Sequence, residues 1–264
     1  FNVYGGLALA SITGIVVIGG LKRIAEVASY LVPFMGSIYF GAMLIAIFLN
    51  LELVVPAFKL IFIDAFNGTA IAGGTFIGVL IYGVRRGAFS NEAGMGTESL
   101  VHGVAKVSNP VKQGLVAMTG PIFDTLIICT ATALIILISG VWETSTSQGV
   151  TLTSEAFNLL LGDLGGFILF ACVICFGLST IFTYSYYGAT CARFIFGSFG
   201  MNFYIYLYII GIFIYSIVPI DIAINIADGA FAMMAIPTLI SALWLAPKVM
   251  QESKNYFKLI NNIS

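Results

Sequence analysis

Long apolar runs dominate this sequence and restrict the folds open to it more than any other feature. Hydrophobic residues make up 59% of the 264-residue chain and charged residues only 9%, and the mean hydropathy is +1.04. Runs of about 20 apolar residues are long enough to cross a bilayer as helices. Because these runs do not alternate apolar with polar residues, they favour helices over the strands of a membrane barrel. The sequence therefore predicts an all-α, polytopic membrane protein.

A sliding window of about 20 residues predicts seven membrane-spanning helices. The candidate spans cover residues 3–21, 30–50, 69–90, 113–139, 164–192, 201–219 and 221–246. Cytoplasmic loops of membrane proteins carry an excess of lysine and arginine. Alternating the loops places only Lys59 on one side, and places on the other side Lys22, Arg23, Lys106, Lys112, Arg193, Lys248, Lys254 and Lys258. We therefore expect residue 1 outside the cell and residues 247–264 as a cytoplasmic tail.

Several residue types that often mark function are poorly placed for it in this chain. The few charged residues form no basic stripe, which argues against nucleic acid as a partner. All four cysteines lie within apolar runs, so we expect them to pack and not to form disulfides or a metal site; they are Cys129, Cys172, Cys175 and Cys191. We expect the single histidine, His102, to form hydrogen bonds near the cytoplasmic surface.

The third span ends in a polar, glycine-rich segment that extends from Arg85 to Ser99. A helix broken at membrane depth persists only where protein or a water-filled cavity satisfies the freed backbone groups. Many secondary transporters hold their substrate at such discontinuous helices. The residues that permit the break or face a ligand there are Gly87, Phe89, Ser90, Asn91, Glu92, Gly94 and Gly96. Residues 94–107 can continue as a second half-helix, which we expect to end at Asn109, before Pro110.

Polar residues inside the other spans are costly in lipid, which favours a structural or a pathway role for them. In the fourth span, Thr125, Cys129 and Thr132 recur at helical spacing beside Asp124. Membrane threonines often form interhelical hydrogen bonds, and both this interpretation and a pathway role for Asp124, Thr125 and Thr132 stay open. In the last span, Asp228 is placed to pair across the bundle. An intramembrane aspartyl enzyme that uses Asp124 with Asp228 is a further alternative, although no motif supports it.

The fifth span carries a series of hydroxyl groups, which belong to Ser179, Thr180, Thr183, Tyr184 and Tyr187. Hydroxyl and carbonyl oxygens are suitable ligands for a hard cation such as sodium. Serine and threonine hydroxyls also bond back to the preceding helical turn. From this helix alone, the second interpretation is favoured.

Three consecutive stretches of the chain carry a resemblance to a known family. They are GVRRGAFSNEAGMGTES at residues 83–99, NPVKQGL at residues 109–115 and FDTLIICTATALIILISG at residues 123–140. Together they resemble the alanine or glycine:cation symporter family of bacterial and archaeal secondary transporters. Residues 19–39, 178–188 and 228–244 support the resemblance, which covers nearly the whole chain.

The resemblance implies a fold. Members of this family are similar to the leucine-transporter architecture, in which two inverted repeats of five helices follow one extra helix. On that template, the seven predicted spans would be the fourth through tenth core helices of a single transmembrane domain, residues 1–264, that lacks the N-terminal helices of the family. The predicted break then falls in the sixth core helix, and the expected fold is a partial leucine-transporter-like bundle with one discontinuous helix.

The resemblance also implies a function and its residues. It assigns substrate binding to Gly87, Phe89, Ser90 and Asn91, and a sodium ion to the Phe176 carbonyl, Ser179 and Thr180. The expected activity is sodium-coupled symport of small neutral amino acids, alanine or glycine, by alternating access in a prokaryotic plasma (inner) membrane. This implication reverses the preference stated above for Ser179 and Thr180. An inactive fragment or a membrane scaffold stays open as the alternative.

Overall fold

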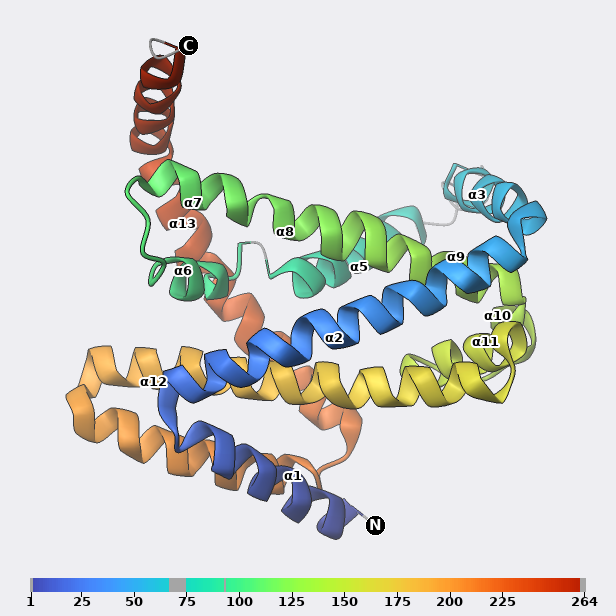
Figure 1. Cartoon of the computed structure of the whole chain (residues 1–264), viewed down its shortest axis with the longest axis horizontal. Helices are drawn as coiled ribbons and strands as arrows, with labels where there is room; N and C mark the ends of the chain where they lie inside the picture. Colours follow the sequence, from blue (N-terminus) through green and yellow to red (C-terminus); the bar gives the residue numbers. More distant parts are fainter. Residues whose placement is uncertain (1, 67–74, 93, 262–264) are drawn as a thin grey trace.

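The computed structural model is helical throughout its regular elements in the residues that it describes, 2–66, 75–92 and 94–261 (Figure 1). The elements, in chain order, are α1 (Asn2–Val17), α2 (Gly20–Leu49), α3 (Leu51–Ala65), α5 (Thr75–Asn91), α6 (Thr97–His102), α7 (Pro110–Ala117), α8 (Thr119–Pro121), the π-helix η1 (Ile122–Cys129), α9 (Thr130–Ser139), α10 (Val141–Thr144), α11 (Val150–Leu161), α12 (Asp163–Tyr215) and α13 (Ile220–Asn261). The all-α prediction is therefore confirmed for this part of the chain.

Among the described residues, four helices are long and apolar enough to cross a membrane. They are Arg23–Leu49, Pro110–Ser139, Asp163–Tyr215 and Ile222–Asn261. Two shorter apolar helices, Val3–Val17 and Val150–Leu161, accompany them. These lengths agree with a multi-pass membrane protein, and the predicted count of seven spans stays a prediction.

The best-buried part of the molecule lies where α2 crosses α9, α11 and α12. Met43, Ile135 and Phe157 are fully buried there, and the Tyr39 ring stacks on Phe157 with 5.8 Å between the ring centroids. Because lipid tails are as apolar as these side chains, membrane helices associate through close packing. Small residues allow that approach, and Ala46 is accordingly buried completely.

The element α12 contains two helical segments that fold back on each other. The turn lies at Gly197, whose φ of 70° and ψ of −160° are confined almost entirely to glycine. The second segment returns along the first (Figure 1), and the Tyr208 hydroxyl donates to the Ile181 carbonyl at 2.8 Å. The fifth and sixth predicted spans, 164–192 and 201–219, correspond to these two segments.

Other predicted boundaries differ from the structure. The second predicted span begins at residue 30, but α2 begins earlier, at Gly20. Gly20 follows the turn of residues 18–19 and has a positive φ of 76°. The third predicted span is described only from residue 75, because residues 69–74 lie outside the described part. The last span continues to Asn261, so the predicted tail is helical as far as it is described; residues 262–264 are outside that part.

The predicted half-helix of residues 94–107 is wrong in its extent. The structure forms only the short α6, which ends at His102. Asn109 and Pro110 do not end this helix; they start the next one. Asn109 is extended, with a φ of −146°, and its side chain accepts a hydrogen bond from the Val111 amide. Proline at the first helical position then begins α7, where its missing N–H leaves no bond unmade.

The hairpin within α12 yields a test of its packing. A methyl group added at Gly188 would overlap the Tyr204 phenol ring of the returning segment. We expect Gly188→Ala to destabilise the protein by about 1–3 kcal/mol, as overpacking usually does, and to lower its thermal unfolding midpoint in detergent. Gly177→Ala is the matched control on the same helix, because a Cβ there has no neighbour within 4 Å. Equal midpoints for both variants would contradict this packing.

Candidate functional site

The helix break is shorter than the sequence predicts and begins later. α5 continues through Gly87 and ends at Asn91, so Gly87 lies inside the helix and the break begins after it. The chain then turns through Glu92, Gly94 and Gly96, with φ angles of 55°, 81° and 88°. Glu92 is the only non-glycine residue with positive φ in the described part of the chain. Left-handed conformations at non-glycine residues are disfavoured and gather at functional sites.

Three consecutive residues at this break, Ser90, Asn91 and Glu92, are each held by a polar partner. We call them segment 90–92. The Ser90 hydroxyl donates to the Asp124 carboxylate, and the Asn91 amide donates to the Thr125 hydroxyl at 3.2 Å. The break therefore begins where polar groups from another helix meet the end of α5.

The third partner comes from a different helix. The Tyr184 hydroxyl of α12 donates to a Glu92 carboxylate oxygen at 2.7 Å. Since unpaired polar groups are costly in hydrocarbon, partners from both η1 and α12 stabilise segment 90–92. The sequence singles out Tyr184 as one of several hydroxyls, but contains no signal that pairs it with Glu92.

The partners of Ser90 and Asn91 lie in a π-helix. The η1 turn extends from Ile122 to Cys129, and π-turns inside α-helices are frequently found at functional sites. In this wider turn, the sequence neighbours Asp124 and Thr125 both contact the last turn of α5. The predicted pathway residues Asp124 and Thr125 and the predicted substrate residues Ser90 and Asn91 therefore form one contact region.

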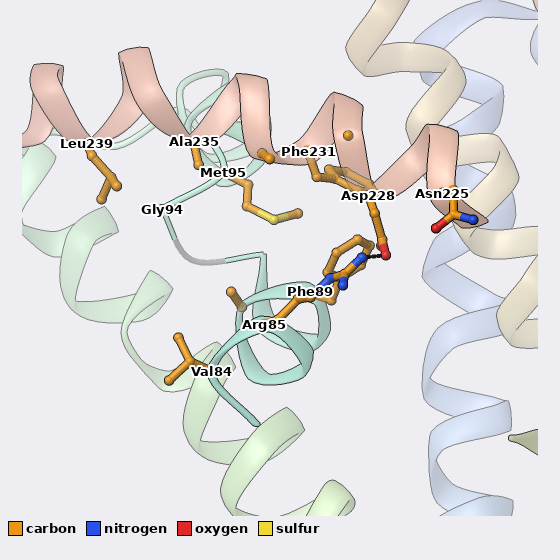
Figure 2. A pocket seen from close by; sticks show the side chains of 13 residues that line it. Val84, Arg85, Phe89, Gly94, Met95, Asn225, Asp228, Phe231, Ala235 and Leu239 are labelled. Carbon is orange, nitrogen blue, oxygen red and sulfur yellow. Dashed lines mark ion pairs between the residues drawn. The ribbon is translucent and has the colours of Figure 1, made fainter. Parts of the chain in front are cut away.

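A cavity of about 620 Å³ lies beside the break, between α5 and α13 (Figure 2). Phe89 extends into it from α5, Met95 from the chain after the break, and Phe231 from α13. The Phe89 and Phe231 rings meet edge to face, with centroids 4.6 Å apart, which is a favourable aromatic geometry. A mostly apolar cavity with a few polar groups is the usual form of a small-molecule site.

An ion pair joins the two helices that line this cavity. The Arg85 guanidinium of α5 contacts the Asp228 carboxylate of α13 (Figure 2). The expectation that Asp228 pairs across the bundle is confirmed. Asp228 is 10% exposed and Arg85 46% exposed, so the carboxylate is the more desolvated partner. Asp124 binds Ser90 and lines a different cavity, so the geometry does not favour a carboxylate pair of Asp124 with Asp228.

That second cavity, of about 270 Å³, collects residues from several helices. Asp124, Thr132, Tyr39 and Phe176 all line it. Thr132 and Tyr39 are joined by a hydrogen bond of 2.8 Å between their hydroxyl oxygens. An interhelical hydrogen bond, one of the two alternatives for Thr132, is therefore present. A place on a pathway stays a prediction for Asp124, Thr125 and Thr132.

The predicted sodium residues follow one another along the first segment of α12. The buried Ser179 hydroxyl donates to the Phe176 carbonyl at 2.9 Å, while Thr180 is exposed. Thr183 likewise bonds back to the Ser179 carbonyl. Back-bonding, the interpretation favoured from this helix alone, therefore occurs at Ser179 and Thr183. A hydroxyl that donates its hydrogen keeps two lone pairs, so its oxygen can still bind a cation.

Two other predicted residues, Gly87 and His102, do not line the large cavity. Gly87 lies inside α5 with open space around its Cα, and it does not line the large cavity. His102 forms a hydrogen bond of 2.7 Å with the Gln113 side chain, as expected, and its place near the cytoplasmic surface stays a prediction. The sequence missed Phe231, which carries no polar or spacing signal and becomes part of the cavity wall only because α13 packs against α5.

The ion pair yields a test of the cavity wall. We expect Arg85→Gln to destabilise the protein by about 2 kcal/mol because it leaves the Asp228 charge without its partner; the figure is below the value for fully buried pairs because Arg85 is half exposed. Thermal unfolding in detergent measures the change. Arg86→Gln is the matched control, since Arg86 lies over the Tyr82 ring of its own helix. Equal losses in both variants would show that the pair does not contribute.

Comparison with known proteins gives the family. Residues 2–262 match the sodium:alanine symporter family. An uncharacterized transporter of Bacillus subtilis, YflA, is 37% identical over 257 residues, which are 94% of this chain and 54% of the relative. The sodium/alanine symporter AgcS of Methanococcus maripaludis is 35% identical over 97% of this chain and 57% of its own length. The probable sodium/glutamine symporter GlnT of Bacillus subtilis is 34% identical over 95% of this chain and 53% of its own length.

The chain spans about half the length of these curated relatives. The family match covers residues 2–262 of this chain, and it includes the break, the cavity residues and both segments of α12. The family is one of transporters and not of enzymes, which excludes the aspartyl enzyme considered above. The chain belongs to the sodium:alanine symporter family.

Proposed function

We propose that this protein acts in sodium-coupled symport of small neutral amino acids, alanine or glycine, by alternating access. The observation that carries the proposal is the helix break whose polar end, segment 90–92, lies next to the aromatic cavity. Relatives named as sodium/alanine and sodium/glutamine symporters support the coupling ion and the class of substrate. The proposed location is a prokaryotic plasma (inner) membrane, with the tail of residues 247–264 in the cytoplasm.

The chemistry of the break suits an amino acid. The C-terminal end of a helix carries a partial negative charge from its free carbonyl groups, and α5 ends at Asn91, where those carbonyls can accept hydrogen bonds from a substrate ammonium group. Ser90 and Asn91 supply polar side chains there, and Phe89 supplies an apolar wall on the side of the cavity. With Gly87 in the preceding turn, these are the proposed substrate residues.

The proposed sodium site consists of the Phe176 carbonyl, Ser179 and Thr180. Neutral oxygens can bind a hard cation without burying a second full charge. The 2.9 Å contact between the Ser179 hydroxyl and the Phe176 carbonyl places two of the oxygens together. Sodium bound there would stabilise the conformation that binds the amino acid, and by thermodynamic reciprocity the amino acid would tighten sodium binding by the same factor.

The proposed fold is the leucine-transporter arrangement, with seven spans as the fourth through tenth core helices of a single domain, residues 1–264. The break in α5 supports it, since discontinuous helices form the central binding site of that architecture. The fold-back at Gly197 supports it as well, because it divides one long helix into two antiparallel segments. On this proposal, Asp124, Thr125 and Thr132 lie along the transport pathway.

Uptake of labelled alanine into proteoliposomes tests the proposed activity. The protein from its complete coding sequence should accumulate alanine when a sodium gradient is imposed, and this uptake should stop when the gradient is abolished. The 264-residue chain is measured beside it. Uptake by the former alone would identify the chain as an inactive part of a symporter, whereas no uptake by either, with alanine or glycine and with a sodium or a proton gradient, would refute symport and favour a scaffold.

A substitution tests the proposed sodium residues. In the same proteoliposomes, we expect Thr180→Ala to raise the sodium concentration for half-maximal uptake about tenfold. This is the effect of losing one oxygen ligand whose contact with sodium contributes about as much as a hydrogen bond. The apparent affinity for alanine should fall with it, because the two bindings are linked. Thr180→Ser keeps the hydroxyl and serves as the control. An unchanged sodium dependence in Thr180→Ala would remove this residue from the site.

A further inference from the structure

Tyr184 is the point at which the break, α12 and α13 meet. Its hydroxyl donates to the Glu92 carboxylate at 2.7 Å. Its ring meets the Phe231 ring of α13 edge to face, with centroids 6.0 Å apart, and Phe231 in turn packs against Phe89 of α5. One side chain of α12 therefore contacts both the polar start of the break and the aromatic wall of the large cavity.

Glu92 has an unusual backbone that this contact holds in place. Its φ of 55° is in the left-handed region, where a side chain is disfavoured and persists only if the surroundings fix it. Its carboxylate is partly buried and also needs a donor, since unpaired polar groups are costly in apolar surroundings. The Tyr184 hydroxyl supplies that donor, and a hydrogen bond to a charged acceptor is stronger than one between neutral groups.

The Tyr184–Glu92 bond joins residues that lie next to the two proposed binding sites. Tyr184 is one helical turn beyond Thr180 of the proposed sodium site, and Glu92 directly follows Asn91 of the proposed substrate site. A bond that joins the two elements can be made in one conformation and lost in another. Coupling between two ligands requires such a difference in contacts between states.

We propose that the Tyr184–Glu92 hydrogen bond transmits the coupling between sodium and the amino acid, with Tyr184 as the positioning residue. Sodium on α12 favours the arrangement in which Tyr184 reaches Glu92. The bond then fixes the left-handed turn at Glu92 and so holds Ser90 and Asn91 in the geometry that binds substrate. This inference rests on the proposed function and adds to it a residue that touches neither ligand.

The test measures the coupling factor itself. In the purified protein from the complete coding sequence, alanine affinity is determined by calorimetry without sodium and at saturating sodium, and the ratio of the two dissociation constants is the coupling factor. Tyr184→Phe removes the hydroxyl and keeps the ring against Phe231. We expect the factor to fall about tenfold, as the loss of a hydrogen bond to a charged group predicts, while the sodium-free alanine affinity changes less than twofold.

Tyr208→Phe is the matched control, because it removes a tyrosine hydroxyl from the same element, where that hydroxyl donates to the Ile181 carbonyl. We expect it to leave the coupling factor unchanged. Glu92→Gln keeps an acceptor oxygen but no charge, so its factor should lie between those of the parent and Tyr184→Phe. If Tyr184→Phe fails to fold, Glu92→Gln tests the same bond.

The outcomes separate this inference from the proposed function. A parent protein whose alanine affinity does not depend on sodium would overturn the proposed symport, and this inference with it. A parent that shows coupling, beside a Tyr184→Phe variant with the same factor as Tyr208→Phe, would overturn this inference alone. A uniform loss of alanine affinity at both sodium levels would also count against it, because that result indicates structural damage and not lost coupling.

Discussion

The need to satisfy polar groups at a helix break in apolar surroundings determines the arrangement around the site. α5 stops at Asn91, and the side chains at its end find partners on two other helices, η1 through Asp124 and Thr125, and α12 through Tyr184. Water cannot supply these bonds within a bilayer. The helices around the break must therefore approach it closely and in a fixed register, and the cavity beside Phe89 lies along the same break.

The helical class could be predicted from the sequence because its cause is local. Uncharged runs of about 20 residues have no stable alternative to a helix in a bilayer. The ends of the helices were harder to predict from the sequence. Asn109 and Pro110 are equally compatible with the end of one helix and the start of the next, and the structure uses them as a start. Gly20 and Gly197 act as turns, yet the sequence contains many glycines that do not turn, so their positive φ angles had no distinct signal.

The candidate site could be predicted only as far as its residues share one segment. Phe89, Ser90 and Asn91 are adjacent, and the polar character of residues 85–99 identified them, together with the glycines of the turn. The pairings of Glu92 with Tyr184 and of Arg85 with Asp228 join residues that are far apart in the sequence. Nor does any pattern in residues 122–129 indicate the π-helix that the structure forms there.

The fold-back of α12 at Gly197 also bears on the order in which the protein assembles. Its closing bond, from Tyr208 to Ile181, joins residues 27 positions apart, whereas the bond from Tyr184 to Glu92 joins residues 92 positions apart. Contacts between nearby residues close a shorter loop and form sooner. The α12 hairpin is thus expected to form before Tyr184 finds Glu92, so the break is completed late, against a hairpin that already exists.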